Sequence, residues 1–238
     1  MHLLSDTHIG SNTVEGYIPL SLYIIDNAFE SLIECRYYKT EPQLNKSAVI
    51  FVGGVGGGWD SPSKGLYPKL AYKLVKDYNT YDDGKINSLR IKFRYPTDLE
   101  KSVMDVMAGI EFLTQKEKIS SIGLVGHSFG GAVVVSSAAK VISDPFYNNA
   151  IKTVVTLSTQ SYGTEGVPKL KEGKCSILLI HGNSDDVLPP YCSSYVYKKA
   201  KEPKQLVLYD NAGHGLDEVS EKVFKKLQKW FVENLNKK

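Results

Sequence analysis

The sequence has few of the residues that build stapled, fibrous or disordered proteins. Its 238 residues include three cysteines, Cys35, Cys175 and Cys192, an odd number without C-x-x-C spacing. This pattern fits neither a disulfide framework nor a zinc site, and we expect free thiols in a reducing compartment. With 10 prolines and no low-complexity tract, the chain is also neither collagen-like nor disordered in composition.

The chain also lacks long apolar runs and a marked excess of charge. The stretch 17–25 is too short to span a bilayer, and residues 1–10 lack the basic and apolar parts of a signal peptide. Lys and Arg total 29 against 26 Asp and Glu, so the net charge is +3. Such a balance creates no field that favours nucleic acid or an anionic membrane. We therefore expect a soluble, cytoplasmic protein that binds neither.

The composition is that of an ordinary globular protein, with 42% hydrophobic and 23% charged residues. This length fits one domain with a single core, so we expect residues 1–238 to form one domain.

From residue 47 onward, short β-branched runs alternate with longer segments that carry an apolar stripe at helical spacing. We expect strands at 47–52, 89–93, 121–125, 153–157, 177–181 and 205–209. We expect helices at 66–74, 103–113, 132–142, 190–201 and 219–231. This alternation predicts an α/β fold with a mostly parallel sheet and helices on both faces. Segments 17–25 and 32–38 should form an antiparallel hairpin at one sheet edge, within an N-terminal region 1–46.

The strongest motif is Gly126-His127-Ser128-Phe129-Gly130, between an expected strand and an expected helix. This G-x-S-x-G pattern is typical of a tight turn that exposes a nucleophilic serine above the sheet. The alternative interpretation is a glycine-rich turn with an incidental serine. The position of the motif between strand and helix favours the nucleophile.

An activated serine needs a histidine base and an acid that orients the base. Asp185 follows one expected strand and His214 follows the last one, in a loop flanked by glycines. Because the carboxyl ends of parallel strands meet at one edge, we expect Ser128, Asp185 and His214 to form a catalytic triad. Asp186 is the rival acid. We expect the other four histidines to be structural or solvated.

The loop Gly53-Gly54-Val55-Gly56-Gly57-Gly58-Trp59-Asp60 follows the first parallel strand. Its glycines leave backbone amides exposed, so we expect the amides of Val55 and Phe129 to form the oxyanion hole. A phosphate-binding role is less favoured, because the loop lacks both the Lys-Ser/Thr ending of a P-loop and G-x-G-x-x-G spacing.

Together, GGVGGGWD, GHSFGG, HGNSDDVLP and NAGHG resemble the α/β-hydrolase superfamily, in particular its small lidless members that are similar to dienelactone hydrolases and carboxylesterases. The resemblance covers about residue 47 to the C-terminus. It implies an eight-stranded sheet with an antiparallel second strand, no cofactor, and Asp185 rather than Asp186 as the acid. Dienelactone hydrolases proper use cysteine, so the serine here implies a carboxylesterase that acts on small acyl esters.

The substrate pocket is expected to be open, because only residues 159–176 separate two strands where relatives carry a lid. Its walls should include Gly54, Trp59, Arg94, Tyr95 and Gln160. Arg94 could bind a substrate anion, but we favour its pairing with a structural carboxylate.

Other functions fit the sequence less well. Ser5-Asp6-Thr7-His8 resembles the opening of a binuclear metallophosphoesterase, but the further metal ligands are missing, so we expect no metal. A non-catalytic binding protein on the same fold would be expected to have lost at least one part of the site. Thioesterase, acyltransferase and peptidase activities would use the same triad and stay open.

Overall fold

The computed structural model describes residues 4–11, 13, 15–26, 29–40, 46–76, 85–147 and 149–235. Within these ranges the chain forms a nine-stranded sheet in the order β1-β2-β3-β5-β4-β6-β7-β8-β9. The strands are β1 (Leu4–Ile9), β2 (Ile18–Asp26), β3 (Phe29–Tyr38), β4 (Ser47–Val52), β5 (Asn87–Ile91), β6 (Ser121–His127), β7 (Ile151–Leu157), β8 (Ser176–Gly182) and β9 (Lys204–Tyr209). Strands β4 to β9 run parallel, which confirms the expected architecture.

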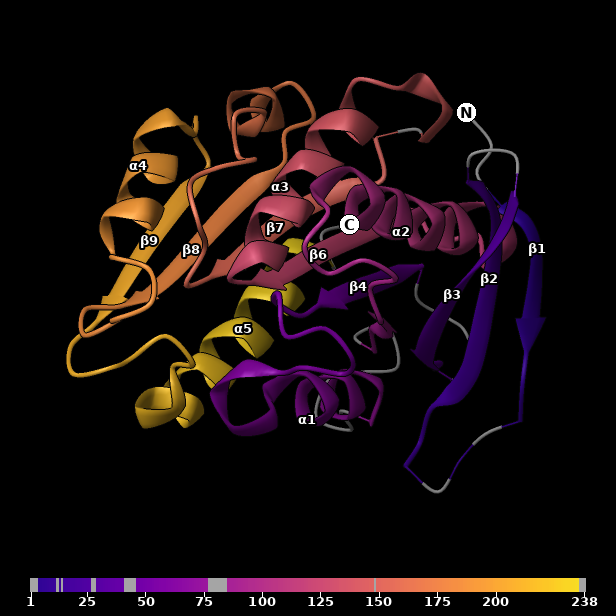
Figure 1. Cartoon of the computed structure of the whole chain (residues 1–238), viewed down its shortest axis with the longest axis horizontal. Helices are drawn as coiled ribbons and strands as arrows, with labels where there is room; N and C mark the ends of the chain where they lie inside the picture. The colour runs from indigo at the N-terminus through magenta and orange to yellow at the C-terminus, as the bar shows by residue number, and fades with distance from the viewer. Residues whose placement is uncertain are drawn as a thin grey trace.

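Helices cover both faces of this sheet (Figure 1). The α-helices are α1 (Pro62–Lys76), α2 (Leu99–Glu111), α3 (Phe129–Ile142), α4 (Tyr191–Lys199) and α5 (Ser220–Leu235). Short 3-10 segments lie at Pro145–Tyr147, Val167–Lys171 and Asp217–Val219, and a π-helical turn at Phe112–Lys116 continues α2. Each helix expected from the apolar stripes is present, with ends shifted by a few residues.

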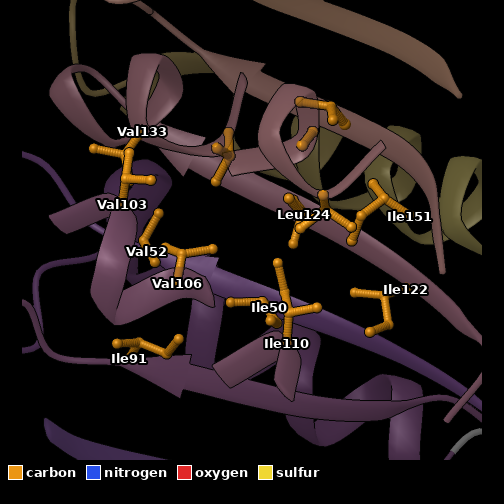
Figure 2. Close-up of a cluster of buried hydrophobic side chains, with 14 of the residues drawn as sticks. Ile50, Val52, Ile91, Val103, Val106, Ile110, Ile122, Leu124, Val133 and Ile151 are labelled. Atoms are coloured by element: carbon orange, nitrogen blue, oxygen red, sulfur yellow. The ribbon is translucent and has the colours of Figure 1, made fainter. Parts of the chain in front are cut away.

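Two apolar layers hold the helices to the sheet. On one face, Val103, Val106 and Ile110 of α2 and Val133 of α3 pack on Ile50 and Leu124 of the central strands (Figure 2). On the other face, α1 and α5 pack on the same strands through residues such as Leu70 and Leu227. The strands between these layers are buried along their whole length, as continuous apolar runs predict.

The N-terminal region departs from the sequence-based expectation in one respect. Strands β2 and β3 form the predicted antiparallel hairpin, and β3 pairs antiparallel with β5. An additional strand, β1, pairs antiparallel with β2 and forms the edge of the sheet, so the hairpin lies one strand inside it. The eight strands β2 to β9, with β3 as the antiparallel second member, match the resemblance, and β1 raises the count to nine. Its polar sequence LSDTHI is mostly exposed and gave no apolar signal.

Strand β5 also begins two residues earlier than predicted. Its Arg90 is buried and is the fourth of five strand residues rather than the second. No helix in the described ranges is both long enough and apolar enough to cross a membrane.

Candidate active site

Ser128 lies in a sharp turn between β6 and α3 and has a positive φ, with φ 54° and ψ −120°. For a residue with a side chain this conformation is strained, and such strain concentrates at functional sites. Two glycines make the turn possible. A Cβ atom on Gly126 would collide with the carbonyl of Gly130, and one on Gly130 would collide with the carbonyl of Gly53. The strand, turn and helix therefore form the elbow that the motif predicts.

Asp185 and His214 meet at the same edge of the sheet. Oδ2 of Asp185 lies 2.8 Å from Nδ1 of His214. The other oxygen, Oδ1, accepts hydrogen bonds from the amides of Val187 and Leu188 at 2.9 and 2.8 Å. The Asp185 carboxylate is fully buried, whereas Asp186 is exposed. Of the two adjacent acids, only Asp185 contacts the histidine.

Hydrogen bonds keep the Asp185 carboxylate ionised. Burial by itself acts to raise its pKa. The amide of Leu188, the imidazole of His214 and the amide of Val187 together outweigh burial and hold the pKa of Asp185 below its usual value. Because the carboxylate only accepts, Nδ1 of His214 carries the proton, which leaves Nε2 as the basic nitrogen.

A second histidine, His181, also contacts the acid. Its Nε2 lies 3.0 Å from Oδ2 of Asp185 and 3.0 Å from the carbonyl of Leu188, while Nδ1 lies 2.7 Å from Oγ of Ser193. Burial lowers the pKa of His181, which favours the neutral ring. Since both neighbours of Nε2 only accept, Nε2 carries the proton and Nδ1 accepts from Ser193. The sequence analysis gave His181 no role at the site. Its position four residues before Asp185 was the one feature of the sequence that could have indicated this contact.

The serine elbow also touches the histidine loop. Nε2 of His127 lies 3.0 Å from the carbonyl oxygen of His214, and the two imidazole rings are 4.8 Å apart. A carbonyl needs a donor, so His127 is protonated at Nε2. Burial lowers its pKa, and its Nδ1 is buried without a hydrogen-bond partner among the described residues. The sequence analysis treated His127 as structural or solvated, and the structure adds this link between Ser128's neighbour and His214.

The loop of His214 is anchored on its far side by the start of α1. The amide of Ser63 donates to the carbonyl of Gly215 at 2.7 Å, and the amide of Lys64 donates to Oδ1 of Asp217 at 2.8 Å. Ser63, Lys64 and Gly65 all have left-handed φ values, and the regular helix begins after them. Three consecutive residues of this kind hold the first turn of α1 against the histidine loop.

The glycine-rich loop after β4 lies against Ser128. A Cβ atom on Gly54 would come within 3.3 Å of Cβ of Ser128. Asp60 braces this loop, since its Oδ2 accepts from the amide of Gly54 at 3.4 Å and its Oδ1 from the amide of Ser61 at 2.8 Å. The backbone of Val55 therefore follows directly on the residue that borders Ser128.

Comparison with known proteins shows the family of the chain. Residues 68–195, more than half of the chain, match the family described as lipase (class 3). The chain belongs to the class 3 lipase family. A kynurenine formamidase from Meyerozyma guilliermondii is 32% identical over 93 residues, which is 38% of this chain. The aligned part spans about a third of that curated relative (33%).

Solved structures show the same fold as this lipase-family chain. Dienelactone hydrolase from Anabaena variabilis is 18% identical with a TM-score of 0.70, covering 91% of this chain and 99% of that one. Est1E from Butyrivibrio proteoclasticus is 16% identical with a TM-score of 0.67 over the same shares. The protein therefore has the α/β-hydrolase fold, in agreement with its membership of the class 3 lipase family.

The expected wall residues of this lipase-family site differ in their surroundings. Tyr95 is 45% exposed, and Nζ of Lys101 lies 4.2 Å from its ring centroid. The side-chain amide of Gln160 donates to the carbonyl of Tyr162 at 3.0 Å. The guanidinium carbon of Arg36 lies 4.3 Å from the ring centroid of Trp59. Each of these three side chains is therefore engaged by a residue outside the predicted site.

Arg94 is committed to structural carboxylates. Its Nε lies 2.6 Å from Oδ1 of Asp105, and its Nη1 lies 2.9 Å from Oδ2 of Asp26 and 2.6 Å from Oγ of Ser31. The side chain is 7% exposed. This is the pairing that the sequence analysis favoured, and the structure gives no support to its assignment as a substrate-binding residue.

The described part of the lipase-family chain contains no group of three or more His, Cys, Asp or Glu side chains that could hold a metal ion. Asp6 and His8, from the rejected metal motif, lie on the edge strand β1 opposite Tyr23 and Ser21.

Proposed function

We propose that the protein is a serine hydrolase that cleaves ester-like acyl bonds of small molecules through an acyl-enzyme intermediate. Ser128 is the nucleophile, His214 the general base and acid, and Asp185 the group that orients His214. The observation that carries this proposal is the 2.8 Å contact between Asp185 and His214, whose loop touches the elbow of Ser128 through His127.

In the first half of the reaction, Nε2 of His214 takes the proton of the Ser128 hydroxyl while Oγ attacks the acyl carbon. Asp185 stabilises the imidazolium that forms, because its carboxylate stays ionised. Collapse of the tetrahedral intermediate expels the alcohol, which receives the proton from His214. Water then attacks the acyl group by the same route, releases the acid and restores the hydroxyl of Ser128.

The developing oxyanion needs donors that are already in place. We assign this role to the amides of Val55 and Phe129. Two features support it: Phe129 directly follows the nucleophile at the start of α3, and the loop of Val55 borders Ser128 through Gly54. Asp60 holds that loop from behind, so the amides need little rearrangement during the reaction.

The residues between β7 and β8 contain one 3-10 turn at Val167–Lys171 and no α-helix. We therefore propose an open pocket that accepts esters without a lid movement, with Gly54, Tyr95 and Gln160 beside it. We further propose that residues 1–238 are one domain, because Leu20 and Leu22 of β2 share a core with the central strands.

The test is covalent labelling with a fluorophosphonate probe, followed by turnover of a panel of small acyl esters, a thioester and an aryl formamide. The aryl formamide is included because the curated relative is a formamidase. Wild-type protein should be labelled once per chain and hydrolyse at least one ester, while Ser128→Ala should show neither property and unfold at the same temperature. Labelling that survives in Ser128→Ala would show that another residue is the nucleophile.

A further inference from the structure

A cavity of about 660 Å³ lies between β3, β5 and the start of α1. Its lining includes Arg36, Arg90, Tyr38, Trp59, Asp60 and Tyr72, and none of the three proposed catalytic residues. The wall therefore includes two guanidinium groups and three aromatic rings, together with the carboxylates of Glu15 and Asp60. Nothing in the proposed ester hydrolysis uses it.

The two arginines occupy neighbouring positions on one face of the sheet. Arg36 of β3 and Arg90 of β5 are directly opposite each other in the antiparallel register. Like charges in such a cross-strand pair repel each other and destabilise the sheet. The guanidinium of Arg36 is sandwiched between Tyr17 at 4.7 Å and Trp59 at 4.3 Å, which orients it without neutralising it.

Neither arginine has an anionic partner among the described residues, since no carboxylate oxygen lies within 4.0 Å of either guanidinium. Asp60 lines the cavity, but its oxygens accept from the amides of Gly54 and Ser61. Glu15, also in the lining, is exposed. Both guanidinium groups therefore line the cavity without a direct ion pair.

Of the two arginines, Arg90 is the one whose charge is destabilised more by this arrangement. It is 3% exposed, and its Nη2 donates to the carbonyl of Trp59 at 2.9 Å. Burial lowers its pKa and the charge of Arg36 adds to this effect, while a hydrogen bond with the Tyr38 side chain acts in the opposite direction. A buried charge is ordinarily paired with an opposite one, and an anion in the cavity would supply that pairing for both arginines.

We propose that this cavity binds the oxyanion group, a carboxylate or a phosphate, of a small molecule. The planar guanidinium groups of Arg36 and Arg90 contact the oxygens, and the rings of Trp59 and Tyr72 contact the adjoining apolar part of the ligand. Guanidinium groups suit this task because they donate two parallel hydrogen bonds to such an anion.

Isothermal titration calorimetry with benzoate, inorganic phosphate and the neutral benzamide tests the proposal. The titrations use wild-type protein, Arg36→Met and Lys92→Met. Lys92 pairs with the exposed Glu34 and lies outside the cavity, so its variant removes the same charge without touching the site. At least one anion should bind at one site per chain, with benzamide at least tenfold weaker. Arg36→Met should raise the Kd at least tenfold, and Lys92→Met less than twofold.

The choice between benzoate and phosphate identifies which oxyanion the cavity prefers. If Arg36→Met does not fold, Arg36→Lys replaces it, since this variant keeps the charge but loses the fork, and its Kd should rise at least threefold. Equal effects of the Arg36 and Lys92 variants, or no saturable binding of either anion, would overturn the proposal. So would binding that the fluorophosphonate probe abolishes, because the anion would then occupy the Ser128 site.

Discussion

Replacing Asp185 by Asn tests the proposed acid most directly. The carboxylate has two acceptor oxygens, and both are used: Oδ2 faces His214, while Oδ1 accepts from the amides of Val187 and Leu188. An asparagine has one acceptor oxygen. If that oxygen serves the two amides, the NH2 group faces Nδ1 of His214 and favours the tautomer in which Nδ1 is unprotonated and Nε2 is not basic.

The expected loss of catalytic activity follows from the loss of the productive tautomer of His214. We expect kcat to fall about 10⁴-fold, equivalent to about 5 kcal/mol of transition-state stabilisation, with little change in KM. Ester turnover is measured beside Asp186→Asn, which changes an exposed carboxylate and should retain more than half of the wild-type rate. If the two variants lose activity equally, or if Asp186→Asn is the more damaged, the assignment of Asp185 is wrong.

Three further predictions concern folding and pH. The pKa of Asp185 is lower in the folded protein than in the unfolded chain, so its ionisation stabilises the fold above about pH 5, and this stabilisation is lost as the pH falls below about 4. The difference in Tm between wild type and Asp185→Asn should therefore shrink on acidification. A difference that stays constant would show that the pKa of Asp185 is not lowered by folding. Arg94→Met should lower the free energy of unfolding by about 3–5 kcal/mol, because it removes the guanidinium group that pairs with the fully buried Asp105. In the same urea titrations, Lys92→Met should change the free energy of unfolding by less than about 1 kcal/mol. Gly126→Ala should abolish labelling of Ser128, since its Cβ would collide with Gly130; a variant that is labelled at the wild-type rate would show that the elbow tolerates a side chain.

The parallel half of the fold could be predicted because its signals are local. The runs at 47–52 and 177–181 are apolar throughout, as strands buried on both faces must be. Strand β1 could not be predicted in this way. It lies at the sheet edge, its residues are mostly exposed, and its polar sequence has no apolar period to detect.

In the candidate site, too, the residues with a local sequence signal could be predicted and the others could not. Ser128 and His214 were predictable because each sits in a glycine-flanked loop after a strand, and Asp185 because its loop follows β8. The roles of His127 and His181 depend on contacts between segments far apart in the chain, such as the 3.0 Å contact from His127 to the carbonyl of His214. No spacing rule in a single sequence encodes those contacts. Trp59 was expected at the substrate, but its ring lies against Arg36, which belongs to β3, a strand paired with β5.

The left-handed turn at Ser63–Gly65 has a practical meaning for protein engineering. Because the amides of Ser63 and Lys64 donate to Gly215 and Asp217, the segment that carries the proposed catalytic imidazole is not an independent module. A chimaera that imports this segment from a homologue would break those two attachments unless it also imports the beginning of the first α-helix. Recombination sites are therefore better chosen so that both pieces, about 150 residues apart in the chain, come from one parent.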